Sequence, residues 1–276
     1  MSNASTPADS DSPRPDPALR PDVPHPARMY DYYLGGKDNF PADREAAEKV
    51  IAALPSARAN ARANRAFLGR AVRYAASLGI DQFLDIGTGI PSPGNTNEVA
   101  AEVVADARVV YVDNDPIVLT HARALLAGMD ARRRTSVLLG DVREPEKILQ
   151  QAGELLDFDR PVCLMLVAVL HFVKDEERPA ELVRTLLSAL APGSCLILSH
   201  VWREGVDEAT AKRAGDVYLS ATAPAVGRTR AEIETLLEGV ELVEPGLVSV
   251  SHWRPDTPPA PGATPVPILS AVGLLP

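Results

Sequence analysis

A regular alternation of short apolar runs and helical patterns, which begins at Gln82, is the feature that most constrains the fold. Five runs are expected to be strands: 82–86, 108–113, 135–139, 162–169 and 194–201. The segments expected to be helices between them are 97–105, 116–126, 145–155 and 176–190. This alternation predicts a mostly parallel sheet covered by helices on both faces. Right-handed crossovers should bring the carboxyl ends of the strands, where ligands bind, to one edge.

The segments on either side of this core have different patterns. Residues 1–23 contain almost no large apolar side chain and are expected to be a disordered tail. Helices are expected at 42–54, 57–78, 207–219 and 229–237. The segments 241–244 and 247–253 could pair with each other as antiparallel strands, and 268–273 could form a last edge strand.

The stretch Pro26–Phe40 (PARMYDYYLGGKDNF) holds three of the six tyrosines, which suggests an ordered element. It could be a helix that docks its aromatic face on the core and ends at Gly35. It could equally be a lid whose Gly-Gly turn and polar side chains close over a ligand. The two readings are compatible. In the following helix, Arg58, Arg62 and Arg65 share a face, which is either solvated or anion-binding.

The composition is that of an ordinary folded protein, 46% hydrophobic and 24% charged over 276 residues, enough for one large domain with a core. The net charge of −9 gives no reason to expect nucleic acid or an anionic membrane as a partner. No signal peptide is visible, and the longest apolar run, 162–173, is too short to cross a bilayer, so we expect a cytoplasmic protein. Cys163 and Cys195 favour buried thiols in neighbouring strands over a disulfide or a metal site.

Polar groups follow the first three expected strands. The first strand ends in Asp85 and a Gly87–Gly89 turn, where a missing Cβ lets the backbone approach a ligand. The second ends in Asp113, 24 positions after Gly89, close to the spacing of an acidic residue that holds a ribose. Asp115 is better suited to cap the next helix. The third strand leads to Asp141, which taken alone could be a turn residue.

The ordered motifs DIGTG, VDNDP, GDV, VLHFV and LAPGSCLILSHV resemble those of class I S-adenosylmethionine-dependent methyltransferases. More narrowly, PARMYDYYLGGKDNFPADR together with FLDIGTGIPSPGNTNE resembles a bacterial methyltransferase family first catalogued as a domain of unknown function. The likeness runs from about Pro26 to residue 276. It implies a Rossmann-like, doubly wound, seven-stranded-type sheet, with S-adenosyl-L-methionine as cofactor.

The resemblance also implies a division of the chain and a set of site residues. Within one domain, 24–276, a helical cap (24–80) precedes a cofactor-binding core (81–201) and a substrate-side part (202–276). The expected cofactor-binding residues are Tyr33, Gly36, Lys37 and Asn39 in the cap, Asp85, Gly87 and Gly89 around the methionine part, Asp113 at the ribose, Asn114, Asp141 and Val142 at the adenine, and in addition Asn95. The third glycine common in methyltransferase loops is replaced here by Ile90-Pro91, so the loop must take a different path.

Methyl transfer needs mainly proximity and alignment, and a base only for a protonated acceptor. His171, expected near the reactive end, and His200 are the candidate bases, and either could instead be structural. The histidines and cysteines lack metal-ligand spacing. We expect a small-molecule acceptor and leave a homo-oligomer open. The alternatives are a nicotinamide-dependent oxidoreductase, disfavoured by the missing Gly-x-Gly-x-x-Gly spacing, and a regulatory protein that binds the cofactor without catalysis.

Overall fold

The computed structural model describes residues 20–126 and 134–276. Most of the expected tail therefore lies outside the described residues. The sheet has the order β3-β2-β1-β4-β5-β8-β6, with β7 also paired to β8. Its strands are β1 Gln82–Ile86, β2 Arg108–Asp113, β3 Thr135–Leu139, β4 Cys163–Val167, β5 Cys195–Val201, β6 Glu241–Leu242, β7 Val248–Ser249 and β8 Ile268–Leu274. The first five are parallel to one another, and β8 runs antiparallel to β5. The predicted mostly parallel sheet is confirmed.

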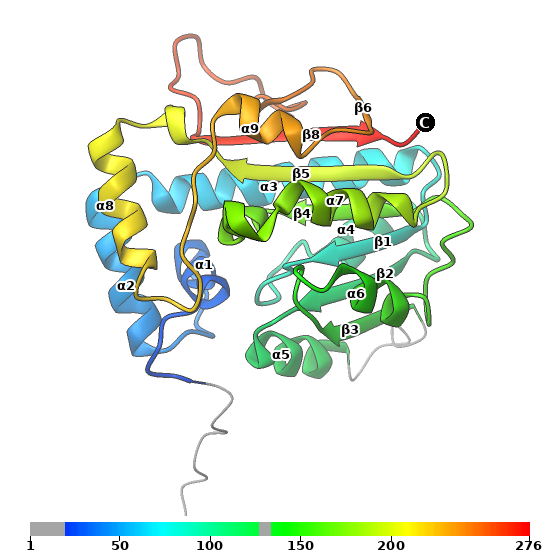
Figure 1. The fold of residues 1–276 in the computed structure, drawn as a ribbon, viewed down its shortest axis with the longest axis horizontal. Helices are drawn as coiled ribbons and strands as arrows, with labels where there is room; N and C mark the ends of the chain where they lie inside the picture. Colours follow the sequence, from blue (N-terminus) through cyan, green and yellow to red (C-terminus); the bar gives the residue numbers. More distant parts are fainter. Residues whose placement is uncertain (1–19, 127–133) are drawn as a thin grey trace, which may run out of the picture.

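Helices cover both faces of the sheet, and others lie beyond the carboxyl ends of its parallel strands (Figure 1). The helices are α1 Pro26–Leu34, α2 Pro41–Ala53, α3 Ala57–Ser77, α4 Thr96–Ala101, α5 Pro116–Leu126, α6 Pro145–Ala152, α7 Pro179–Ser188, α8 Glu208–Tyr218 and α9 Arg230–Thr235. Side chains of α3, α4 and α5 pack on one face, and those of α6, α7 and α9 on the other. The helices α1, α2 and α8, with the start of α3, share a third apolar cluster, which we call the cap cluster. Figure 1 shows the arrowheads of the parallel strands pointing toward it.

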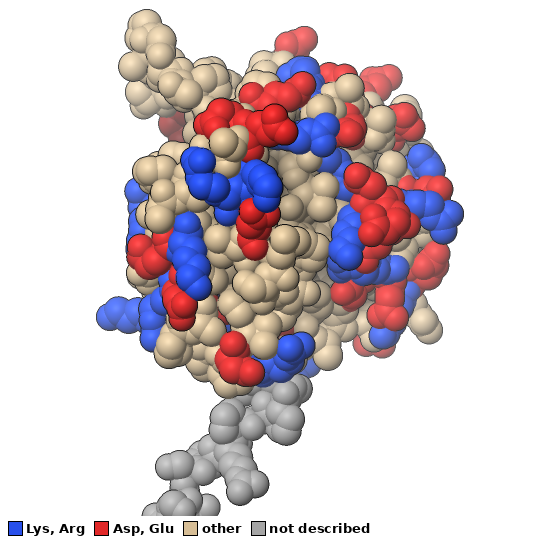
Figure 2. Space-filling view, turned by 60° about the vertical axis from the view of Figure 1, so that its left-hand side comes forward, with Lys and Arg blue, Asp and Glu red and all other residues tan. Residues whose placement is uncertain are grey.

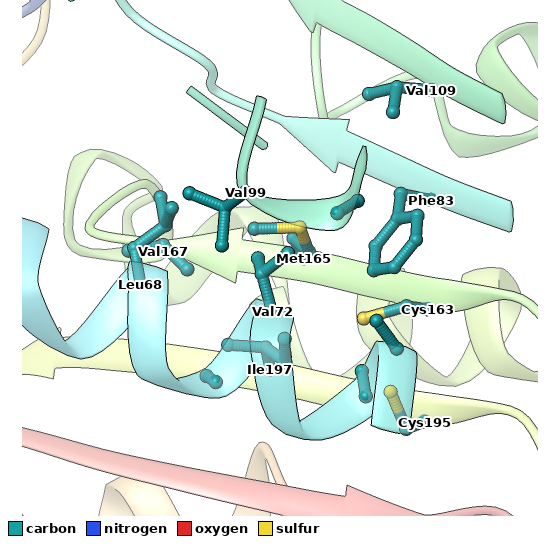
Figure 3. Packing of buried hydrophobic residues seen from close by; sticks show 14 of the residues in the cluster. Leu68, Val72, Phe83, Val99, Val109, Cys163, Met165, Val167, Cys195 and Ile197 are labelled. Atoms are coloured by element: carbon teal, nitrogen blue, oxygen red, sulfur yellow. The ribbon is translucent and has the colours of Figure 1, made fainter. Parts of the chain in front are cut away.

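The second half of α3 belongs to the sheet layer. Figure 3 shows Val72 of α3 beside Met165 of β4 and Ile197 of β5. The Arg70 guanidinium donates to the carbonyls of Val250 and Trp253, which ties α3 to the segment before β8. Of the segment 24–80 predicted as a cap, therefore, only α1, α2 and the first half of α3 face the strand ends.

The two cysteines occupy equivalent positions on neighbouring strands. Cys163 of β4 and Cys195 of β5 are register partners, and both are buried free thiols, as the sequence predicted (Figure 3). Burial raises the pKa of the Cys163 thiol well above its ordinary value. A buried neutral thiol acts as a small apolar side chain.

The sheet differs from the prediction beyond β5. The expectation that 241–244 and 247–253 pair with each other is wrong, because β6 and β7 both pair with β8. The expectation that 268–273 forms an edge strand is also wrong, since β8 lies between β5 on one side and β6 and β7 on the other. Six of the seven residues of β8 are buried, which suits a strand with neighbours on both sides, whereas both residues of β6 are exposed.

The helix expected at 176–190 begins later than predicted. A 3-10 turn, η4 (Asp175–Glu177), precedes it, and α7 begins at Pro179. Between them Arg178 has a φ of 54°, in the left-handed region, and this residue separates the two helical segments. Among the described residues, no helix combines the length and the apolar character needed to cross a membrane.

Candidate functional site

A cavity of about 1420 Å³ lies between the carboxyl ends of the parallel strands and the helices of the cap cluster. Typical pockets for one small ligand measure roughly 300–1,000 Å³, so this cavity can hold two. Nine of the thirteen predicted site residues line it: Tyr33, Asp85, Gly87, Gly89, Asp113, Asn114, Asp141, Val142 and His171. The sequence therefore predicted most of one wall.

The glycine turn after β1 is fixed against the end of the neighbouring strand β2. Gly87 N–H donates to the Val112 carbonyl over 2.8 Å, and Gly89 N–H donates to Asp113 Oδ2 over 2.8 Å. Both glycines have positive φ, 77° and 69°. A Cβ on Gly87 would come within 2.5 Å of Val169, so a larger residue there would also collide with the cavity wall.

Asp85 and Arg65 form the end of the cavity near β1. Asp85 is buried, and burial raises the pKa of its carboxyl, although the hydrogen bond from Thr96 Oγ1 (2.7 Å) and the charge of Arg65 partly oppose this. Arg65 Nη2 donates to Asn95 Oδ1 over 2.7 Å, while Arg65 Nε is buried with no hydrogen-bond partner in the described part of the chain. An unsatisfied guanidinium nitrogen beside a ligand cavity is a candidate donor to an anionic group.

Asp113, the last residue of β2, lines the cavity next to the glycine turn. Its side chain is 6% exposed, and Oδ1 accepts from Asp115 N–H over 2.9 Å. Burial raises the pKa of Asp113 to about 6, although the hydrogen bonds from Asp115 and Gly89 oppose the shift. Asp115 Oδ1 accepts from Ile117 N–H, so the predicted capping role of Asp115 is confirmed.

The polar groups after β3 form a small network around Asp141. Asn114 Nδ2 donates to Asp141 Oδ2 over 3.1 Å, and Arg143 donates to Asp141 Oδ1 from its backbone and its side chain. Burial pushes the pKa of Asp141 up, but these hydrogen bonds and the Arg143 charge bring it below its ordinary value. Asp141 is thus held ionised, with buried Val142 beside it as an apolar surface.

The two candidate bases have different surroundings. His200 Nδ1 lies 2.8 Å from the Val201 carbonyl, and His200 Nε2 lies 2.8 Å from Arg228 Nη1. In the neutral ring, Nδ1 donates to the carbonyl and Nε2 accepts from the guanidinium, so both ring nitrogens already have hydrogen-bond partners. Burial lowers the pKa of His200 to about 4. His200 is therefore a structural residue.

His171 lies on the 3-10 turn η3 (Leu170–Phe172), directly after β4, and lines the cavity. Its side chain is buried, and Nδ1 has no hydrogen-bond partner among the described residues. Burial, with the charge of Arg228 and the neighbouring His200, lowers the pKa of His171 well below its ordinary value. The ring is neutral near pH 7 and keeps a nitrogen able to accept a proton.

The stretch 26–40 forms helix α1, ended by Gly35 in the left-handed region, followed by the polar Gly-Gly turn. Both readings of this stretch thus describe part of it. Tyr33 faces the cavity, and its hydroxyl lies 3.2 Å from that of Tyr218 on α8. Beyond α8, Thr222 N–H donates to the Pro24 carbonyl over 3.0 Å, which joins the two sides of the cap.

Four predicted site residues do not line the cavity: Gly36, Lys37, Asn39 and Asn95. Asn39 donates to Asp31 Oδ2 over 2.7 Å, and a Cβ on Gly36 would collide with the same carboxylate. Lys37 is exposed. In the structure, Gly36 and Asn39 shape the turn after α1, and Asn95 orients Arg65.

Several cavity residues were not singled out from the sequence, chiefly Asn60, Asn64 and Arg143. Asn60 and Asn64 are four positions apart in a helix rich in alanine, and both are buried. Two asparagines on one face of this helix were the sequence signal that could have indicated a binding surface there. Of the three arginines that share one face of that helix, Arg65 reaches the cavity, whereas Arg62 is exposed and Arg58 pairs with Glu48.

Comparison with known proteins places this geometry in a family. A family model described as S-adenosyl methyltransferase matches residues 13–276. A DUF574 family protein from Streptomyces avermitilis is 42% identical, with a TM-score of 0.88, 94% of this chain and 100% of that chain covered. A protein from Thermobifida fusca, described as a candidate methyltransferase, is 40% identical, with a TM-score of 0.88, 96% of this chain and 99% of that chain covered.

A more distant structure has the same fold. The N-methyltransferase NodS from Bradyrhizobium japonicum, in complex with S-adenosyl-L-homocysteine, is 16% identical, with a TM-score of 0.51 and coverage of 90% of this chain and 99% of that chain. The search of curated proteins found no match.

Proposed function

We propose that this chain, which belongs to the S-adenosyl methyltransferase family and uses S-adenosylmethionine, methylates a small molecule inside the cavity between the strand ends and the cap cluster. The observation that carries the proposal is the convergence of three carboxylates, Asp85, Asp113 and Asp141, from three successive strand ends on one cavity with the glycine turn. This set fits a nucleoside joined to an amino acid. The cofactor supplies a methyl group on a sulfonium, whose sulfur keeps the electron pair of the broken bond.

In this proposal the strand-end wall holds the cofactor. Asp113 accepts hydrogen bonds from the ribose hydroxyls, and Asp141, Asn114 and Val142 contact the adenine. Arg65 binds the carboxylate of the amino-acid part, because its Nε is buried and unpartnered among the described residues, and Asp85 faces the ammonium group. The glycine turn provides backbone at close range.

The other predicted residues act indirectly or at the reactive end. Gly36, Lys37 and Asn39 belong to the turn that sets the position of the cap, and Asn95 holds Arg65. His171 is the proposed base, which receives the proton that a hydroxyl acceptor loses. Its neutral ring at pH 7 supports this role.

The surface supports a small acceptor rather than a nucleic acid. Figure 2 shows acidic and basic side chains interspersed on the face toward the cap, with uncharged atoms between them. A nucleic acid substrate would favour a continuous basic surface. We keep the cytoplasm as the expected compartment and leave the oligomeric state open.

Ligand-dependent thermal stability tests the proposal. S-adenosylhomocysteine at 100 times its dissociation constant should stabilise the protein by about 2.7 kcal/mol and raise its melting temperature. NAD and NADP at the same concentration serve as controls for the oxidoreductase alternative. A shift with a nicotinamide cofactor and none with S-adenosylhomocysteine would overturn the assignment of the cavity.

Methyl transfer itself is checked with a panel of small hydroxyl and amine compounds, by following the formation of S-adenosylhomocysteine. The proposal expects turnover with at least one compound, and the His171→Ala variant should lose it while it retains cofactor affinity. Tight cofactor binding without turnover across a broad panel would favour the regulatory alternative.

A further inference from the structure

The cavity has two walls of different chemistry. The strand-end wall carries the carboxylates assigned above to the cofactor. The opposite wall is the cavity side of the cap cluster and contains Tyr30, Tyr33, Val50, Ala57, Ala61, Ala214 and Tyr218. Since the volume exceeds that of a typical single-ligand pocket, the second wall is available to a second occupant.

The cap wall is apolar and aromatic, and its polar atoms bond mainly to one another. Tyr30 hydroxyl donates to the Ala61 carbonyl and accepts from Asn64, and the hydroxyls of Tyr33 and Tyr218 are paired. Among the described cavity residues of α1, α2 and α3, Arg65 alone is an acid or a permanent cation, and it is assigned to the cofactor. A charged group placed against these three helices would therefore be buried without a partner, which is strongly unfavourable.

Charged side chains of α8 that touch the cavity are exposed. Lys212 and Asp216, one turn apart, form an ion pair with each other. They are exposed and paired with each other, so the cap wall itself stays uncharged.

A row of rings joins the reactive end to the cap wall. The ring centroids of His171 and Phe172 are 4.3 Å apart, and those of Phe172 and Tyr218 are 5.7 Å apart. Tyr218 then meets Tyr33 through the hydroxyl pair. Adjacent rings at such spacings present faces and edges on which another ring can stack.

We propose that the space between this row and helices α2 and α3 binds an uncharged aromatic methyl acceptor whose hydroxyl group faces His171. The inference rests on the proposed function of the cavity and adds the class of the acceptor. Ring stacking supplies affinity, and the ring of His171, which lines the cavity, supplies the polar contact that orients the hydroxyl.

Direct binding to the full chain, saturated with S-adenosylhomocysteine, tests this proposal. The probes are 2-naphthol, neutral at pH 7, and 2-naphthoate, its anionic counterpart of similar size. Calorimetry or naphthol fluorescence should show 2-naphthol binding at least tenfold more tightly. Failure of 2-naphthol to bind, or equal affinity for the two probes, would overturn the proposal.

Two variants on helix α8 test whether 2-naphthol binds in the proposed place. Ala214 lies at the cavity side of α8, and Ala209 is exposed on the same helix and does not line the cavity. Ala214→Phe should weaken 2-naphthol binding at least tenfold, and Ala209→Phe should leave it within about twofold. Equal affinities of the two variants would place the probe elsewhere and reject the inference.

A third variant covers the case in which Ala214→Phe does not fold. Tyr218→Leu removes one ring of the row while keeping an apolar side chain, and should weaken 2-naphthol binding about fivefold. Affinity for S-adenosylhomocysteine should stay within about twofold in all three variants. If the unmodified protein does not bind S-adenosylhomocysteine, the proposed function fails. If it does bind but the naphthol predictions fail, only the acceptor class is wrong.

Discussion

Asp113 links the glycine turn, the second strand and the cavity through one carboxylate. It accepts from Gly89 N–H and Asp115 N–H and is 6% exposed. With a pKa raised from 3.8 to about 6, its ionised form costs about 3 kcal/mol near pH 7 relative to an unfolded chain. Because the folded value is the higher one, the stabilising contribution of this group is present below about pH 4 and is lost as the pH rises through 6.

The same shift predicts a pH dependence of cofactor binding. If ribose hydroxyls bind the ionised carboxylate, the competent fraction falls from most of the protein at pH 7 to about a tenth at pH 5, and affinity for S-adenosylhomocysteine should fall roughly tenfold. Calorimetry at the two pH values measures this. In Asp113→Asn, binding should be weaker at pH 7, with a ratio between the two pH values near one. An unchanged ratio in that variant would assign the pH dependence to another group.

Some of the site residues could be predicted from the sequence and others could not. Asp85, Asp113 and Asp141 could be predicted because each comes at or just after the carboxyl end of an expected parallel strand, and those ends meet at one edge. Arg65 could not be chosen over Arg58 or Arg62, since helical spacing shows which residues share a face but not what that face meets. Likewise, the Gly-Gly turn predicted a cap, but which of its side chains turn inward depends on packing against Asp31.

Among the elements, the short segment 226–228 fixes the turn that carries His171. Val226 N–H donates to the His171 carbonyl, and Arg228 pairs with the end of β5. The Arg228 guanidinium is almost fully buried and donates to the carbonyls of Leu170 and Val173 as well as to His200. It also reaches Asp175, which is 73% exposed.

Removal of this guanidinium should be costly. Arg228→Met leaves two buried carbonyls and a ring nitrogen unpaired and should lower the free energy of unfolding by about 3 kcal/mol or more. Asp175→Asn should cost less than about 1 kcal/mol, because its carboxylate is solvated. Urea denaturation measures both, and Arg230→Met, a half-exposed arginine paired with Glu234, is the control. Similar losses in Arg228→Met and Arg230→Met would contradict the assigned role of this segment.

For the whole molecule, the cap is joined to the sheet by a buried ion pair. Arg28 of α1 donates from Nε and Nη2 to the two carboxylate oxygens of Asp115, over 2.7 and 3.0 Å, and both side chains are nearly inaccessible. His25 Nδ1 lies 3.3 Å from the same carboxylate, and burial lowers the pKa of His25. The wall opposite the strand ends therefore depends on a contact 87 positions apart in sequence.

Breaking this pair should loosen the cap. Arg28→Met leaves Asp115 buried without its guanidinium and should cost about 3–5 kcal/mol of unfolding free energy. Hydrogen exchange should rise across 26–34, and affinity for S-adenosylhomocysteine should fall. The control is Arg73→Met, whose partner Glu102 is exposed and whose loss should cost below about 1 kcal/mol. Unchanged exchange across 26–34 would mean that other contacts hold the cap.

At this scale the sequence predicted the layers better than the order of strands. The alternating patterns predicted the parallel half, because a helix between two strands allows them to run parallel. They did not give the strand order, since β4 follows β3 in sequence but pairs with β1. Beyond β5 the segments 241–242 and 248–249 are too short for periodicity to show their strand partners. The role of Asp115 as a helix cap gave no sign of its ion pair with Arg28. Long-range partners of this kind follow from tertiary packing.

The position of β8 has a consequence for the order of assembly. The segments β6 and β7 are synthesised before β8, yet both are joined to the sheet only through it. During translation the nascent chain must keep β5 without a neighbour on that side, and segments 241–242 and 248–249 without their strand partner, until 268–274 emerge. If translation pauses before that point, the nascent chain exposes the unpaired edge of β5. Unpaired, apolar strand edges bind chaperones and also promote aggregation.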